Sequence, residues 1–182
     1  MDPLLSQAEA HLQRLVDATT DEQLGLPSPC DGWSVRDLLN HVVGGAVRYR
    51  LLLEDAPEEL IAGTRTADHL GPDPAASLRD KARVLSSAFA APEAGARIVH
   101  HRAGDITGDQ LRTLRVVECT MHGWDLATAT GQDPTIPDEL AGEVIAATGR
   151  IDMLRGQGFF APPPADVSDD RAVAVLQLTG RA

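Results

Sequence analysis

The chain of 182 residues has little lysine, few aromatic residues and no long apolar run. Lys81 is its only lysine, and the formal net charge is −11 at pH 7. A protein that binds nucleic acid needs a basic surface to release counterions, so this charge argues against such a partner. The same reasoning argues against an anionic membrane. No stretch of about 18 apolar residues is present, and we therefore expect no transmembrane helix.

Cysteine is equally scarce. Cys30 and Cys119 are the only two cysteines, and they lack the C-x-x-C spacing of redox and zinc motifs. We expect Cys119 to be a small buried apolar residue and Cys30 to be an unreactive loop thiol. Charges interrupt the N-terminal segment MDPLLSQAEAHLQRL, where a signal peptide needs an uninterrupted apolar stretch. We therefore expect a soluble, cytoplasmic protein with reduced thiols.

Helix start and stop signals recur along the chain, whereas strand signals are almost absent. Ser34 with Asp37, and Thr107 with Gln110, are pairs typical of helix N-caps. Gly131 is a typical helix end. With the apolar spacing, these signals predict helices over about 3–18, 35–54, 74–91, 107–130, 137–154 and 171–178.

These elements predict an all-α protein. Four long helices, with a long crossover between the second and third, indicate a four-helix bundle with additional C-terminal helices. Residues 92–106 are the one segment that favours a short hairpin. We expect residues 1–155 to form the bundle, and residues 156–182 to form a Pro-rich linker and a short helix that packs on it.

The segment VVECTMHGWDLA interrupts the apolar face of the fourth long helix with Glu118, His122 and Asp125. Glu118 and His122 are one turn apart, so their side chains can meet at a common point. Burying an unpaired charge costs several kcal/mol, so these groups need a partner. They could satisfy each other as a hydrogen-bonded pair or face a wet groove; alternatively, they could bind one divalent ion. The role of Asp125 is open between support of a neighbour and helix packing.

A third ligand would have to come from another helix. His41 lies on the flank of the apolar stripe of the second helix, and Asp37, one turn earlier, could accept its other ring N–H. Taken alone, His41 is typical of a boundary histidine; the other histidines, His11, His69, His100 and His101, are weaker candidates. His41, Glu118 and His122 would form a His₂Glu site with an open position, which is the catalytic type of zinc site.

Two segments together carry a family resemblance. LPSPCDGWSVRDLLNHVVGG and ECTMHGWDLATATGQ resemble the metal-binding DinB-like family, which includes the N-terminal domain of mycothiol-dependent maleylpyruvate isomerase. The resemblance covers residues 5–155 and implies a four-helix bundle. It also implies a divalent metal, usually zinc, held by residues that correspond to His41, Glu118 and His122. Nickel, iron and manganese suit the same ligands.

The resemblance further implies a low-molecular-weight thiol, mycothiol, as cofactor. A metal-bound thiol loses its proton near neutral pH and becomes a nucleophile. The isomerase carries a further C-terminal domain, whereas about 25 residues follow the fifth helix here. We therefore expect a thiol S-transferase acting on a small electrophile, with Trp33, Trp124 and Arg48 as candidate pocket walls.

Other functions stay open at this point. A non-catalytic metal-binding or stress-response module fits the same polar core, and a metal-dependent hydrolase would use the same three ligands with bound water. The sequence assigns no catalytic or thiol-binding residue, and it leaves the substrate undetermined. The expected partners are a small-molecule thiol and an electrophile, with no nucleic acid or membrane. Bundles of this kind are commonly dimers, so a homodimer is also open.

Overall fold

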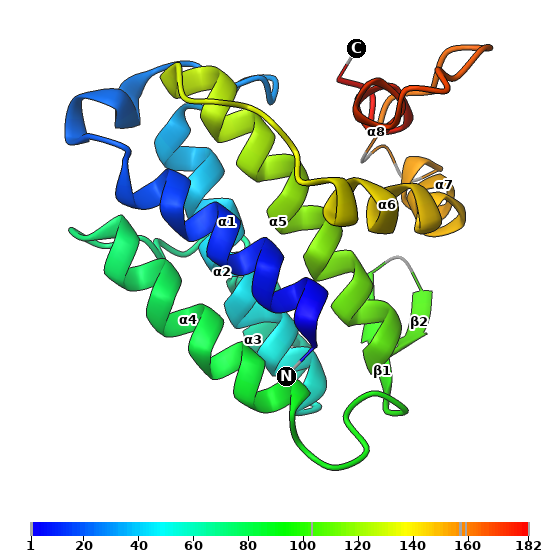
Figure 1. The fold of residues 1–182 in the computed structure, drawn as a ribbon. Helices are drawn as coiled ribbons and strands as arrows, with labels where there is room; N and C mark the ends of the chain where they lie inside the picture. The colour runs from blue at the N-terminus through cyan, green and yellow to red at the C-terminus, as the bar shows by residue number, and fades with distance from the viewer. Residues whose placement is uncertain (1, 103, 157, 159, 182) are drawn as a thin grey trace.

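A four-helix bundle forms the body of the molecule (Figure 1). The computed structural model describes residues 2–102, 104–156, 158 and 160–181. Helices α1 and α2 each pack against both α4 and α5. The predicted all-α bundle is therefore confirmed. The four helices are α1 (Pro3–Asp17), α2 (Val35–Leu53), α4 (Pro74–Phe89) and α5 (Gly108–Thr130).

The predicted helix ends are confirmed in their local chemistry. Ser34 and Asp37 form a capping box at the start of α2, and Thr107 and Gln110 form another at the start of α5. Each pair supplies acceptors for backbone N–H groups that the first helical turn leaves unpaired. Gly131 ends α5 in the left-handed conformation, with φ of 74°, where a side chain would be disfavoured. These caps fix where α2 and α5 begin and where α5 ends.

The shorter elements connect the bundle. The predicted hairpin is confirmed as an antiparallel pair, β1 and β2, although Ala103 lies outside the described residues. It follows α4 and leads directly into α5 (Figure 1). The crossover after α2 contains the short helix α3. These elements are η1 (Asp21–Gly25), α3 (Glu58–Gly63), β1 (Ile98–His101) and β2 (Gly104–Thr107).

The prediction of a single fifth helix over 137–154 is wrong. The structure has two helices, α6 (Asp138–Ala146) and α7 (Thr148–Arg155), with a break at Ala147, whose ψ of 3° departs from helical geometry. The break turns the chain so that Ile151 of α7 packs in the same apolar cluster as Val144 of α6. Burying a side chain of this size contributes about 1.5–3 kcal/mol, which favours the bent path over a straight helix.

The last helix, α8 (Arg171–Leu178), packs on α6 at one side of the bundle (Figure 1). Val175 of α8 joins the cluster of Val144 and Ile151, which also contains Val117 and Met121 of α5. Of the predicted segment 156–182, Gln157, Phe159 and Ala182 lie outside the described residues. Within the part of the chain that the structure describes, no helix has both the length and the apolar character needed to cross a membrane.

Candidate metal centre

A cavity of about 1070 Å³ opens between α2, α5, the loop before α2 and the C-terminal segment. His41 on α2 and Glu118 and His122 on α5, the three predicted ligands, all line it. His41 Nε2 lies 3.4 Å from Glu118 Oε1, and the ring centroids of His41 and His122 are 5.1 Å apart. The fold thus brings the three side chains from two helices to one place.

Glu118 approaches α2 closely because Gly45 has no side chain. A Cβ built on Gly45 would lie 2.6 Å from Glu118 Oε1, closer than any real contact of this kind. On the other side, Arg115 Nη1 donates to Glu118 Oε2 at 2.9 Å and to the Val42 carbonyl at 2.9 Å. Glu118 is therefore clamped between a helix backbone and a guanidinium, and Oε1 is the oxygen directed to His41.

The electrostatics keep Glu118 ionised. Burial alone raises the pKa of its carboxyl group, but the hydrogen bond from His41 and the charge of Arg115 outweigh burial and hold the pKa well below its usual range. An ionised carboxylate oxygen beside an imidazole nitrogen is a donor pair that suits zinc and similar divalent ions. The donor set therefore fits a metal.

Gly45→Ala is expected to lower metal affinity about 10–100-fold, the effect typical of displacing a group that supports a metal ligand. The added methyl group would push the Glu118 carboxylate away from His41, while alanine favours the helix. Metal titration against a competing chelator measures the affinity. Gly149→Ala is the control, because a Cβ there meets nothing within 4 Å. Equal affinities for both variants and the parent chain would contradict this account of Gly45.

His122 is oriented by a partner on its own helix. Its Nδ1 lies 2.9 Å from Asp125 Oδ2, and Arg181 donates to the same carboxylate from Nε at 2.8 Å and from Nη2 at 2.7 Å. Burial lowers the pKa of His122, so its ring is neutral near pH 7. With Nδ1 hydrogen-bonded, Nε2 is the nitrogen free to bind a metal. The open question about Asp125 is answered: it positions His122.

The sequence does not predict that Arg181 takes part in the site. It lies beyond the last helix, where no periodicity or spacing points to α5, and only the tertiary fold brings it to Asp125. Burial raises the pKa of Asp125, but the hydrogen bonds from His122 and Arg181 reverse this effect and lower the pKa below its usual range. The C-terminal segment is therefore part of the site and not only a cover on the bundle.

The other residues that the sequence singled out differ in where they lie relative to the cavity. Asp37 Oδ2 accepts hydrogen bonds from the backbone N–H and the hydroxyl of Ser34, so Asp37 serves the helix cap. Trp33 and Arg48 both line the cavity. The ring centroids of Trp33 and His41 are 4.8 Å apart. Trp124 is not among the described residues that line the cavity.

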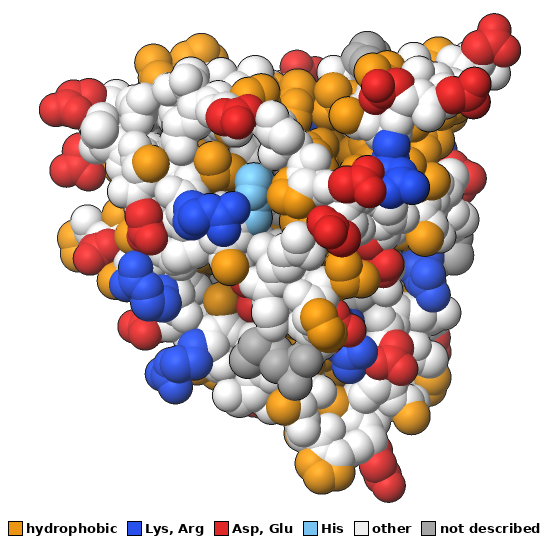
Figure 2. All heavy atoms as spheres, viewed as in Figure 1, with side chains coloured by type: hydrophobic (Ala, Val, Ile, Leu, Met, Phe, Trp, Pro, Cys, Tyr) orange, Lys and Arg blue, Asp and Glu red, His pale blue; other side chains and the backbone are white. Residues whose placement is uncertain are grey.

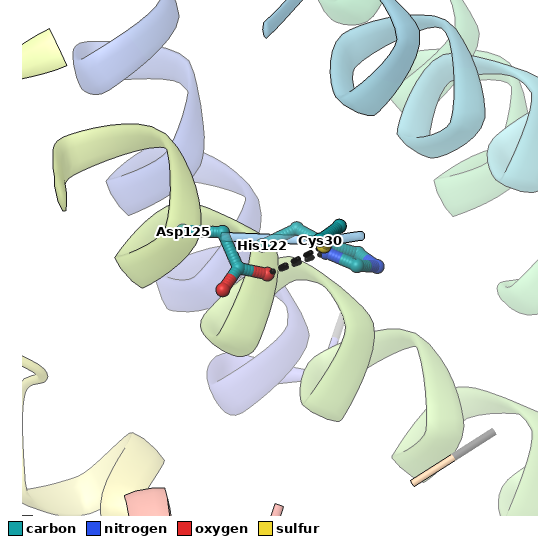
Figure 3. A group of neighbouring side chains, drawn as sticks. All are labelled: Cys30, His122 and Asp125. Atoms are coloured by element: carbon teal, nitrogen blue, oxygen red, sulfur yellow. Dashed lines mark hydrogen bonds and ion pairs between the residues drawn. The ribbon is translucent and has the colours of Figure 1, made fainter. Parts of the chain in front are cut away.

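Cys30 forms a second group of candidate ligands with His122 and Asp125. In the described part of the chain, ligand atoms of these three residues lie within 4.8 Å of one another (Figure 3). Burial and the nearby Asp125 charge raise the pKa of Cys30 to about 12, so the thiol stays protonated and donates to Asp125 Oδ2 at 3.5 Å. Arg181 also donates hydrogen bonds to both carboxylate oxygens of Asp125. The three residues therefore suit a hydrogen-bond network better than a metal site.

The sequence of the chain is similar to those of known proteins. Residues 5–127 match the model of the mycothiol maleylpyruvate isomerase N-terminal domain. Uncharacterized proteins from two strains of Mycobacterium tuberculosis are each 31% identical over 168 residues, which cover 87% of this chain and 85% of theirs.

Solved structures show the same fold. The crystal structure of the mycothiol-dependent maleylpyruvate isomerase superposes with a TM-score of 0.71 at 16% identity, over 98% of this chain and 87% of that chain. A histidine-to-alanine mutant of that isomerase gives a TM-score of 0.70 at 15% identity over the same shares. Because the family model matches residues 5–127 and the fold is shared, the chain belongs to the mycothiol maleylpyruvate isomerase N-terminal domain family.

Proposed function

We propose that the chain binds one divalent ion, zinc, through His41, Glu118 and His122, and uses it with mycothiol as a thiol S-transferase. The observation that carries the proposal is the convergence of two imidazoles and one ionised carboxylate on a single cavity. Each of the two α5 side chains has its own positioning partner: Arg115 holds Glu118, and Asp125 holds His122. Three protein ligands with an open position are typical of a catalytic metal site.

The metal, when bound, would lower the pKa of a coordinated thiol so that the sulfur reacts as a thiolate. The residues of the chain supply the rest. Trp33 forms an apolar wall beside His41, which limits the access of water, and the cavity of about 1070 Å³ has room for a thiol and a second substrate. The membership of the family, whose named member is mycothiol-dependent, supports mycothiol as the thiol.

A thiol-dependent enzyme works where small thiols are kept reduced, which supports the cytoplasm as its location. Both cysteines of the chain are free thiols. The protein's own thiols do not compete for the role of nucleophile, because burial raises the pKa of both Cys30 and Cys119 to about 12. The nucleophile must therefore come from a second molecule.

The test is elemental analysis of the purified protein, followed by thiol titration with and without metal. We expect about one divalent ion per chain, thiol binding that is lost after dialysis against a chelator, and turnover of a model electrophile only when thiol is present. Protein purified without chelator that holds no metal would refute the proposal. Turnover that needs metal but no thiol would identify a hydrolase instead. Metal without thiol binding or turnover would identify a non-catalytic module.

A further inference from the structure

Glu9 is an acidic residue inside the packing of α1 against the bundle. It lies at helical spacing between Leu5 and Leu12, which are both buried in the hydrophobic core. Its side chain is only 12% exposed, and its Oε2 accepts a hydrogen bond from the Ser86 hydroxyl on α4 at 3.1 Å. Burial raises the pKa of its carboxyl group, and the charge of Arg115 opposes this rise. A carboxylate in this place costs free energy, so its presence needs a reason.

Glu9 is one end of a buried row of charges. On the face shown in Figure 2, acidic and basic side chains are scattered over the surface. The Arg115 side chain, in contrast, has no solvent exposure, and that of Glu118 is 10% exposed. Arg115 stands between two carboxylates, because its Nη1 donates to Glu118 Oε2 at 2.9 Å and its Nε lies 3.7 Å from Glu9 Oε1. The row therefore connects α1 to a candidate metal ligand on α5.

The contact between Glu9 and Arg115 acts mainly through charge. A separation of 3.7 Å is longer than an ordinary hydrogen bond. Within the part of the chain that the structure describes, Glu9 Oε1 and Arg115 Nε are buried atoms without a hydrogen-bond partner. Solvent screens buried charges much less than exposed ones. Glu9 can therefore act on Glu118 through the charge of Arg115.

The charges around Glu118 determine how strongly it can bind a cation. Arg115 and Arg48 both place positive charge near its carboxylate. A positive neighbour keeps the carboxylate ionised, but it also repels a divalent ion that binds there. Taken alone, Arg115 and Glu118 cancel in charge. With Glu9, the row carries one net negative charge, so Glu9 restores the charge that Arg115 removes.

We infer that Glu9 is a positioning residue of the metal centre, whose charge offsets Arg115 and thereby lets Glu118 bind a divalent ion strongly. The inference rests on the metal binding in the proposed function and on neither thiol nor turnover. Ser86 orients Glu9 and adds no charge. A role of Glu9 in folding alone would instead predict lower stability with unchanged metal affinity.

Glu9→Gln removes the charge and keeps the shape of the side chain. Zinc affinity, measured by competition with a chromophoric chelator, is expected to fall about 10–100-fold, the effect typical of losing a group behind a metal ligand. Asp17→Asn is the matched control, because Asp17 lies on the same helix and pairs with Arg79 at the surface. Ser86→Ala is a second control, which removes a hydrogen bond and leaves the charge of Glu9. Both controls should bind zinc as the parent chain does.

Azide binding to the cobalt-loaded protein separates a charge effect from a loosened site. Visible absorption of Co²⁺ reports the binding of azide. In Glu9→Gln the surroundings of the ion lose a negative charge, so azide should bind about tenfold more tightly although zinc binds more weakly. A loosened site would weaken the binding of both. Glu9→Asp keeps the charge and should bind azide as the parent chain does.

The outcomes distinguish this inference from the proposed function. A parent chain that binds no zinc refutes the proposed function, and the inference falls with it. Zinc affinity that is equal in the parent chain and Glu9→Gln, or azide affinity that falls in this variant, overturns the inference alone. Opposite shifts in zinc and azide affinity support it, whether or not the protein turns over a thiol. Urea denaturation in chelator checks that each variant is folded, and Glu9→Met, which fills similar space, repeats both measurements should Glu9→Gln not fold.

Discussion

Replacing Arg115 by methionine is expected to lower the free energy of unfolding by about 3–5 kcal/mol, the typical cost of removing one partner of a buried ion pair. The Arg115 side chain has no solvent exposure, and its Nη1 holds both Glu118 and the Val42 carbonyl. Its Nε also lies 3.7 Å from Glu9 Oε1 on α1. Methionine fills similar space but leaves two buried carboxylates without a cation.

Urea denaturation in the presence of a chelator measures this loss without a contribution from metal binding. The exposed Arg83 on α4 offers the matched control, and Arg83→Met should stay within about 0.5 kcal/mol of the parent chain. The double variant Arg115→Met with Glu118→Gln should recover part of the loss, because it removes one of the stranded charges. A loss below about 1 kcal/mol in Arg115→Met would mean that water reaches these carboxylates and would contradict a dry ion-pair network.

Arg115 also shows where prediction from the sequence ends. The apolar stripe of α5 could be read from helical spacing, and with it the inward direction of Glu118 and His122. Nothing in that spacing distinguishes a basic residue on the solvent side from one enclosed by α1 and α2. Arg115 is enclosed because Glu9 and Glu118 meet it there. That meeting depends on the packing of three helices, which only the fold determines.

The helix boundaries were predictable for the opposite reason: their causes are local. Ser34, Thr107 and Gly131 act on backbone groups a few residues away, so the residue type at one position is sufficient. The break at Ala147 has no such signal, because it results from the burial of Ile151 in a cluster that includes the distant α8. The contact of Arg181 with Asp125 depends on the same kind of long-range packing.

The two groups of candidate ligands make opposite predictions, because His41 belongs only to the first and Cys30 only to the second. Both are half-buried residues at the same cavity, so His41→Ala and Cys30→Ala are matched substitutions. His41→Ala is expected to lower zinc affinity by more than about 100-fold, since the loss of even a supporting residue costs about 10–100-fold. Cys30→Ala should leave the affinity unchanged, because its thiol is protonated and Asp125 is held by Arg181.

Competition with a chromophoric chelator measures both affinities, and His122→Ala, which removes a ligand from either group, should abolish binding in both accounts. Cobalt substitution gives an independent readout, because a thiolate bound to Co²⁺ produces a charge-transfer absorption band. The cobalt protein alone should lack this band, and added thiol should produce it as the sulfur takes the open position. A band without added thiol that disappears in Cys30→Ala would instead assign the metal to Cys30, His122 and Asp125. That result would leave His41 and Glu118 as a structural pair without a metal.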